Sequence, residues 1–388
     1  MLPRLSLVAR PALHVASVAV IAFGASCSDS DATSALALQG APAAKPAAEA
    51  AKPAAKPLKL RKVAVHDQGI GCTAFTLLVP AEWETRGGVQ WQMQYANLAS
   101  GRFEAFDPKG KAALELFPVI PACWDESGML GAKGQNYMGS VIYPPPRDAL
   151  QYVREVFVPL YRANAMGLKV GAATPLPEVA RAVERAVQEP SVTKSATAAR
   201  VRLEYEDGGK PIAEDVFVTI VLSRSPILPN MTHWSLEHQY SFRAEKKELD
   251  ALAPVMQTIA ASVRLELDWY AGYAQVLDLW RQGQMQSIRD AGELSRRISR
   301  NNDAILASMR SSWEARQSAQ DRMAREFSEA IRGVETYDQP FEHQSIQLPS
   351  GYRDVWVNPR GEYVLSNEAG YDPNVGATQE WRRMQATR

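Results

Sequence analysis

Side chains able to carry out acid–base or metal chemistry are scarce in this sequence. The 388 residues include five histidines and three cysteines. His233 and His238 lie five positions apart in HWSLEHQYSF, which has the alternating pattern of a strand. Because successive side chains point to opposite faces of a strand, the two imidazoles cannot ligate one metal ion together. We interpret His238 as a core histidine. It shares its expected face with four apolar or aromatic residues, Trp234, Leu236, Tyr240 and Phe242.

No short motif of a catalytic or nucleotide-binding site is present. The sequence contains no GxSxG, HExxH, GxxxxGK[ST] or GxGxxG. The glycine-rich stretch at residues 128–140, GMLGAKGQNYMGS, has the wrong spacing for a phosphate-binding loop and predicts a flexible loop. The acidic clusters WDESG and YEDGGK are typical of hairpin turns, because Asp and Gly favour turn dihedrals. We therefore expect no resident metal or cofactor and, more simply, no active site.

The overall charge argues against a nucleic-acid partner. Basic and acidic side chains number 43 each, so the formal net charge is zero. Such a balance gives no overall field that would attract nucleic acid or an anionic membrane surface.

Residues 1–27 have the parts of an export signal. Two arginines precede an almost continuously apolar run, residues 11–23, which is too short to span a bilayer. The small residues GAS then lead to Cys27. This arrangement resembles the lipobox of bacterial lipoproteins, which implies that Cys27 is lipidated and holds the protein on an envelope membrane. The alternative is ordinary cleavage near Ala25, with release to the periplasm.

Residues 28–58 predict an extended linker. The tetrapeptide AAKP occurs three times in this stretch, which is rich in Ala, Pro and Lys. Recurrent proline prevents a continuous helix, and few large apolar side chains are available to form a core. Such a linker would hold a folded domain away from its anchor.

The two cysteines beyond the signal, Cys72 and Cys123, are interpreted as one disulfide. An even number of cysteines in an exported chain favours pairing. Neither GIGCTAF nor IPACWDE contains the further cysteine or histidine that a zinc site needs. The bond would close a loop of about 50 residues and stabilise the fold by about 4 kcal/mol.

Residues 59–267 predict an α+β domain with an antiparallel sheet and flanking helices. Segments such as ARVRLEYED alternate between apolar and polar residues, as half-buried strands do. Residues 148–165 and 247–263 have helical spacing, and the second has an apolar stripe. The opening phrase FTLLVPAEW, the order of elements and the closing IAASVRL resemble the PsbP/Mog1 fold. That resemblance implies a sandwich used for binding or scaffolding.

Residues 268–333 predict a long amphipathic helix or a helical hairpin broken near Gly283. Apolar residues return to one face of this helix, and pairs of them lie eleven positions apart. A packed helix, self-association and a membrane contact are the three alternatives, in that order of preference. The residues that would contact a protein partner or a second copy are Leu294, Ile298, Ile305, Met309, Trp313, Phe327 and Ile331.

Residues 334–388 predict a small β-rich tail. LPSGY and VNPRGEY are typical of turns, and three strands between and after them would form a meander. Tyr352, Trp356 and Tyr363 are candidate binding residues, because a pocket between them would suit a small molecule.

Together these features favour an exported, lipid-anchored envelope protein that binds or scaffolds without catalysis. Two alternatives remain open. One is an extracytoplasmic hydrolase in which His238 meets a carboxylate and a hydroxyl only in three dimensions. The other is a small-molecule sensor that uses the aromatic residues of the tail.

Overall fold

The computed structural model describes residues 57–387 except 120, 187–191, 227, 284–301, 332 and 343. The predicted signal with Cys27 and all but the end of the predicted linker lie outside these residues. The described chain is mixed α/β and rich in strands, which form two antiparallel-dominated sheets and a separate hairpin. Within the described ranges, no helix combines the length and the apolar character needed to cross a membrane.

The larger sheet has ten strands. Seven of them follow one another across the sheet in the order β3, β4, β5, β12, β11, β10, β9; their bounds are Glu84–Trp91, Ala99–Phe106, Ala113–Leu116, Met231–Glu245, Lys210–Arg224, Thr193–Asp207 and Met166–Pro175. Three short strands attach to β12 through β6: these are β6 (Ala122–Asp125), β7 (Asn136–Tyr137) and β8 (Ser140–Ile142).

The central strands of this sheet are long because their sequences alternate or stay apolar over 15 residues. In β10 the alternation is as expected, with Val201, Leu203 and Tyr205 buried. The β10–β11 hairpin turns at Gly208 and Gly209, whose φ values of 59° and 74° suit glycine. The strands β11 and β12 are buried along both faces, rather than half-buried as predicted, since apolar side chains cover each side.

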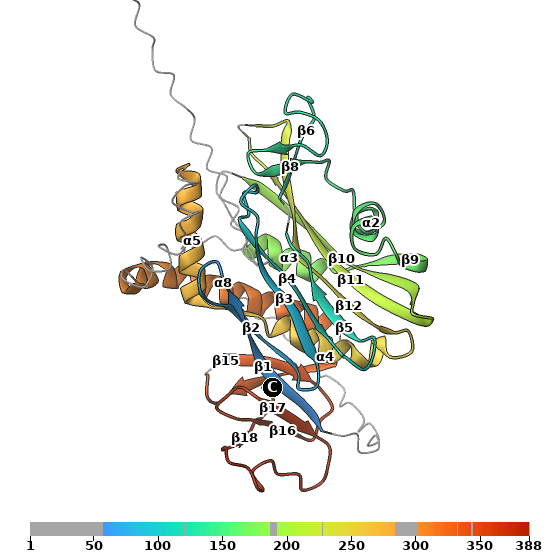
Figure 1. Cartoon of the computed structure of the whole chain (residues 1–388), viewed down its shortest axis with the longest axis vertical. Helices are drawn as coiled ribbons and strands as arrows, with labels where there is room; N and C mark the ends of the chain where they lie inside the picture. The colour runs from blue at the N-terminus through green and yellow to red at the C-terminus, as the bar shows by residue number, and fades with distance from the viewer. Residues whose placement is uncertain are drawn as a thin grey trace, which may run out of the picture.

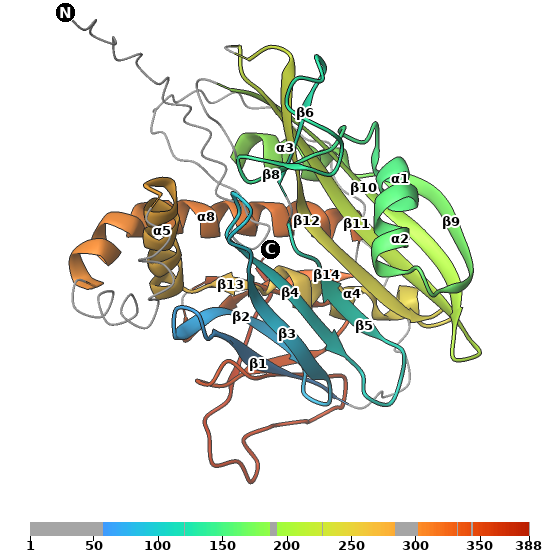
Figure 2. The same ribbon diagram turned by 45° about the horizontal axis from the view of Figure 1, so that its top comes forward.

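Helices pack on both faces of the larger sheet (Figures 1 and 2). One face carries three consecutive helical stretches, α1 (Ala149–Tyr152), the π-helical η1 (Val153–Phe157) and α2 (Val158–Tyr161). The other face carries α3 (Pro177–Ala186), α4 (Leu249–Ala261), α5 (Leu267–Arg281) and α8 (Asn302–Ile331). The helices expected within 148–165 and 247–263 are therefore both present.

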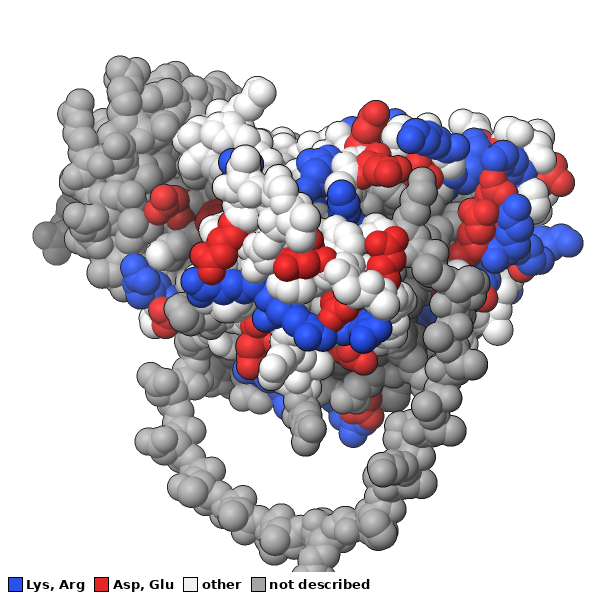
Figure 3. All heavy atoms as spheres, turned by 90° about the horizontal axis from the view of Figure 1, so that it is seen from below, with Lys and Arg blue, Asp and Glu red and all other residues white. Residues whose placement is uncertain are grey.

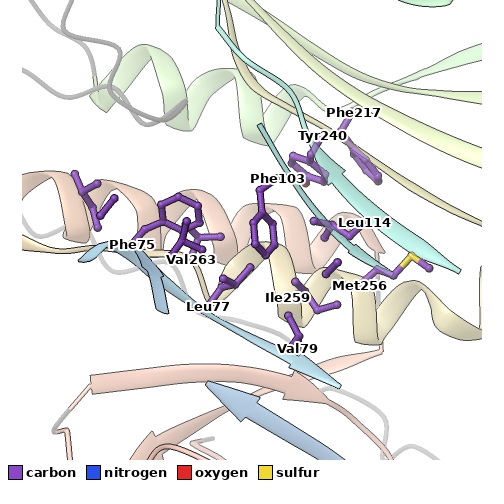
Figure 4. Close-up of a cluster of buried hydrophobic side chains, with 14 of the residues drawn as sticks. Phe75, Leu77, Val79, Phe103, Leu114, Phe217, Tyr240, Met256, Ile259 and Val263 are labelled. Atoms are coloured by element: carbon purple, nitrogen blue, oxygen red, sulfur yellow. The ribbon is translucent and has the colours of Figure 1, made fainter. Parts of the chain in front are cut away.

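The main apolar core lies between the larger sheet, α4 and the first strands of the chain (Figure 4). Met256 and Ile259, from the apolar stripe expected on α4, are fully buried in it. Each such side chain contributes about 1.5–3 kcal/mol when removed from water. A second cluster, which includes Phe117 and Phe157, fills the space under η1 and α2 on the opposite face.

The smaller sheet joins the two ends of the described chain. Its six strands, in order across the sheet, are β13 (Arg264–Leu265), β2 (Cys72–Pro80), β1 (Leu58–Asp67), β17 (Tyr363–Ser366), β16 (Asp354–Val357) and β18 (Arg382–Arg383). The pairing of β1 with β17 places Leu58 opposite Leu365. The tail therefore does not form a meander of its own, because its β16–β17 hairpin completes a sheet that the first strands begin. A separate hairpin consists of β14 (Val334–Gln339) and β15 (Gln344–Pro349).

The segment 268–333 is divided rather than one continuous helix over its described parts. The helix α5 ends at Arg281, and Gly283 follows with a φ of 72°, which suits the end of a helix. The helix α8 lies at a steep angle to α5 (Figure 2) and packs against α3, α4 and α5.

Candidate functional site

A small, partly open hollow lies where the two ends of the described chain meet, and its lining combines apolar with polar groups. Five separate parts of the chain line it: β1, β2, the end of α4 with β13, the β14–β15 hairpin, and the start of β17. The polar side chains among its walls are Lys62, Thr76, Ser262, Arg264, Gln339, Glu342, Gln344, Ser345 and Tyr363.

The walls of the hollow are held by hydrogen bonds that cross between these segments. Ser262 Oγ, at the C-terminal end of α4, accepts the backbone N–H of Leu78 at 2.8 Å. Gln339 is buried at the end of β14, and its Oε1 accepts the backbone N–H groups of Phe341 and Glu342, which fixes the turn into β15. The side chains at the rim are thus carried on segments that are themselves tied down.

Opposite charges are paired around the hollow. Lys62 Nζ and Glu342 Oε1 lie 2.8 Å apart, and Arg264 forms a 2.8 Å ion pair with Asp321 of α8. Burial raises the pKa of the nearby Glu266 carboxyl, an effect that Lys62 only partly offsets. On the surface seen from below in Figure 3, basic and acidic side chains are likewise interspersed.

This arrangement suits recognition of a small polar group rather than a highly charged one. A paired lysine and glutamate present one donor and one acceptor without a large net field, and the amides of Gln339 and Gln344 add both kinds of group. Burial raises the pKa of Tyr363, so its hydroxyl stays protonated and can donate a hydrogen bond. The lining side chains include no histidine or cysteine.

The three aromatic residues expected to form a pocket in the tail are not brought together around one. Tyr363 lines the hollow and is buried in the apolar cluster of the smaller sheet. Tyr352 packs against the edge of that cluster and does not line the hollow. Trp356 lies on the opposite face of β16 from its neighbours Val355 and Val357, which are in the cluster.

His238 lies at a β-bulge, and the expectation that it shares a face with four apolar residues was wrong. The pairing of β11 with β12 shifts register between Phe217 and Thr219, and His238 has a left-handed φ of 52°. The extra residue reverses the alternation, so Trp234 packs on one side of the sheet and Tyr240 on the other. Strict alternation in the sequence could not reveal this, because a bulge leaves no pattern of its own.

The hydrolase alternative required His238 to meet a carboxylate and a hydroxyl. Glu237 precedes it, and Ser235 Oγ donates to Glu237 Oε1 at 3.1 Å, but His238 and Glu237 are both buried. Burial lowers the pKa of His238 to about 3, which makes the imidazole a weak base at neutral pH. Burial also raises the pKa of Glu237. These positions argue for a role in the interior of the fold.

The predicted disulfide is not formed, because Cys72 and Cys123 are both free thiols. Cys72 begins β2 of the smaller sheet, whereas Cys123 lies in β6 of the larger sheet, within a different apolar cluster. Burial, with the negative charges of three acidic residues, raises the pKa of Cys72 to about 11, and burial also raises the pKa of Cys123. The number of cysteines in the sequence carries no information about their separation in space.

The expected partner-binding stripe is covered in part by the protein itself. Met309 and Trp313 on α8 pack against the main core, and Trp313 Nε1 donates to the backbone oxygen of Leu265 at 2.8 Å. This is the arrangement expected of a packed helix. The remaining members fall outside the described residues or have side chains that do: Leu294, Ile298, Ile305, Phe327 and Ile331.

Sequence reasoning also missed a buried ion network on the face of the sheet covered by α2. Arg162 donates to both carboxylate oxygens of Glu214, from Nε at 2.8 Å and from Nη2 at 2.7 Å, and Nη2 lies 2.9 Å from Glu115. Glu115 also accepts from Arg243 Nη1 at 3.3 Å, and Tyr205 OH donates to Glu214 at 3.0 Å. The available signal was a pair of acidic residues inside the apolar strand AEDVFVTIV.

No protein-family model matches the chain, and no curated protein matches its sequence.

Proposed function

We propose that this chain is an exported envelope protein, lipid-anchored through Cys27, that acts as a non-catalytic binding module. Its binding site would be the hollow between β1, the β14–β15 hairpin and β17. The observation that carries the binding role is the gathering of a paired lysine and glutamate and two side-chain amides from distant segments around one hollow. The small-molecule sensor is a form of the same function in which binding alters a partner contact.

The anchored arrangement is supported by the position of β1. The described chain enters β1 directly from the linker, and β1 has hydrogen-bonded neighbours on both sides, β2 and β17. A tether attached at Leu58 would therefore act on a strand held along both edges. Figures 1 and 2 show the short strands β6 and β8 at the end of the molecule remote from this sheet.

We further propose that the described domain is a PsbP/Mog1-like sandwich to which the tail has been added. The supporting features are antiparallel strands with helices on their faces and a closing helix, α4, that leads into β13. Contact with a protein partner or a second copy through residues 294–331 also remains a proposal. Light scattering of the purified full chain over a range of concentrations tests that contact. A mass above that of one chain would support self-association, and the mass of one chain at every concentration would contradict it.

Processing and lipidation are tested by intact-mass analysis of the membrane fraction. The expected result is a mature chain that begins at Cys27 and carries added acyl mass, whereas Cys27→Ala stays unprocessed or appears in the soluble periplasm. A wild-type chain of unprocessed length in the cytosol would contradict export. A chain cleaved near Ala25 without acyl mass would contradict the anchor alone.

The hollow is tested with thermal-shift measurements on panels of small polar compounds, namely amino acids, monosaccharides and short amides. A binder should stabilise the wild type and lose its effect in Glu342→Gln and in Lys62→Met. The matched control is Lys59→Met, because Lys59 is exposed on the same strand and does not line the hollow. Stabilisation that survives both substitutions would place binding elsewhere, and no stabilisation by any class would contradict a small-molecule site.

A further inference from the structure

Two methionines are exposed on one projecting segment, the flap, which we define as residues 126–142. The side chains of Met129 and Met138 are 86% and 73% exposed. The flap carries β7 and β8 and lies at the end of the molecule opposite the smaller sheet (Figures 1 and 2). Single exposed apolar side chains are common on protein surfaces. The flap is distinguished by two highly accessible thioether sulfurs on one short segment.

The exposure of Met129 follows from a hydrogen-bonded turn. The carboxylate of Asp125 accepts the backbone N–H groups of Ser127 and Met129 at 3.0 and 2.9 Å, and also the hydroxyl of Ser127 at 2.6 Å. These bonds hold the pKa of Asp125 below its usual value. The backbone at Met129 is therefore fixed, and its side chain extends from a defined position.

Met138 is exposed because it lies in a second turn, which is independent of the first. Met138 and Gly139 form the two-residue turn between β7 and β8, with φ values of 48° and 85°. Positive φ at both positions marks a type I′ turn, which strongly favours Asn followed by Gly. The turn is anchored to the preceding loop, because the Gly139 oxygen accepts Ala96 N–H at 2.9 Å and Asn136 Nδ2 donates to the Gln94 oxygen at 3.0 Å.

We propose that Met129 and Met138 form a reversible oxidation site for two-electron oxidants of the hydroperoxide class. The thioether sulfur attacks one peroxide oxygen; an S–O bond forms as the O–O bond breaks. With hydrogen peroxide, the proton of the transferred hydroxyl goes to the departing hydroxide, so the products are methionine sulfoxide and water. With an organic hydroperoxide, the proton goes to the departing alkoxide, and an alcohol forms in place of water. The sulfur loses two electrons, and the peroxide gains them. Methionine sulfoxide reductases reverse the step with two thiols, which leave as a disulfide with one water.

The other methionines for which burial is described provide the contrast. Met231, Met256 and Met384 are buried, and a polar sulfoxide at such positions would disrupt the core. On the flap the side chains have no core to disrupt, so oxidation there leaves the fold intact. Met166 is 63% exposed on β9, outside the flap, and provides an internal reference. Among the other methionines with described burial, Met93 and Met309 are half-buried.

The test is peptide mapping by mass spectrometry during exposure of the folded, full chain to hydrogen peroxide. Met129 and Met138 should each gain one oxygen at least about tenfold faster than Met231 and Met256. When both flap sites are fully oxidised, the melting temperature should have shifted by less than about 2 °C. Added methionine sulfoxide reductases with a dithiol should then restore the original mass.

Matched variants separate the flap from general surface oxidation. Met129→Leu with Met138→Leu should remove the rapid uptake at the flap, whereas Met166→Leu should leave it unchanged. Oxidation of Met256 at the same rate as the flap would overturn the proposal. So would unfolding that accompanies flap oxidation, because the modification would then be damage rather than a reversible event.

Discussion

Removing the guanidinium of Arg162 should destabilise the fold strongly at neutral pH. In Arg162→Met, the apolar stem still packs near Phe117 and Phe157, over whose rings the guanidinium lies at 5.7 and 5.5 Å. Glu115 keeps its contact with Arg243. Glu214, which is fully buried, loses its two strongest donors and retains the hydroxyl of Tyr205.

The magnitude follows from leaving a buried carboxylate without its cation. Breaking a buried pair by removing one partner costs about 3–5 kcal/mol. The solvent-exposed counterpart is Arg86, which pairs with Glu104 but is 68% exposed. Arg86→Met should cost less than about 1 kcal/mol, because the Arg86 guanidinium is largely in water and the buried Glu104 keeps its pair with Arg243. The variant Arg162→Met with Glu214→Gln removes the stranded charge and should recover most of the loss.

The pH dependence has a defined sign. Burial alone would raise the pKa of Glu214, but the charge and hydrogen bonds of Arg162, with Ser241 and Arg243, lower it overall. In the wild type, the depressed pKa of Glu214 contributes stability at any pH above the pKa that Glu has in the unfolded chain. This contribution is lost as the pH falls through the lower pKa of Glu214 in the folded state. In Arg162→Met, burial raises the pKa of Glu214 instead. The penalty is then full at pH 7 and disappears as the pH falls below about 4.

The assay is urea unfolding of the wild type, Arg162→Met, Arg86→Met and the double variant at pH 7 and pH 4. We expect Arg162→Met to lower the free energy of unfolding strongly at pH 7 and by a smaller amount at pH 4. A loss below about 1 kcal/mol at pH 7 would refute the inference that this pair is buried and essential. A loss that is the same at both pH values would refute the assignment of the penalty to a stranded carboxylate.

Three further predictions concern single positions. Burial raises the pKa of Glu237 in the folded state. The stability that this group contributes is therefore full below the pKa of Glu in the unfolded chain, and it is lost as the pH rises toward the pKa of Glu237 in the folded state. Glu237→Gln should raise the urea midpoint at pH 7 and leave it nearly unchanged at pH 4. Met138→Asn should stabilise the fold by about 0.5–1 kcal/mol in urea unfolding, because Asn tolerates the left-handed turn position better; a loss of stability would contradict the turn geometry. In a Cys27→Ala chain, alkylation at pH 7.5 should leave Cys72, whose pKa is about 11, and Cys123 unmodified until denaturant is added, and rapid labelling of the folded chain would contradict their burial.

Local patterns predicted the elements of this fold better than its connections. The alternation in ARVRLEYED gave β10 and its buried residues, and the helical spacing gave α4. The position of β17 beside β1 had no local signal, since three residue pairs between distant segments form it. The tail was therefore predicted as a small meander of its own strands, although its strand β17 pairs with the first strand of the described chain.

The candidate site was less predictable for the same reason. Tyr363 was singled out for its aromatic ring, but the hollow that it lines needs Lys62 and Glu342 from distant segments. The disulfide failed because pairing depends on distance in space, and Cys72 and Cys123 lie in different sheets. The face predicted for His238 was wrong because the extra residue of a bulge reverses all later side chains in the strand.

The contact between Leu58 and Leu365 has a consequence for how the protein is made. Because the chain is made from its N-terminus, β1 is made long before β17. The edge of β1 that pairs with β17 stays unpaired during that time. The smaller sheet therefore cannot close until residues 363–365 have been made, although it contains the first strand of the described chain. Substitutions in β17 should accordingly slow the last step of assembly more than the formation of the larger sheet.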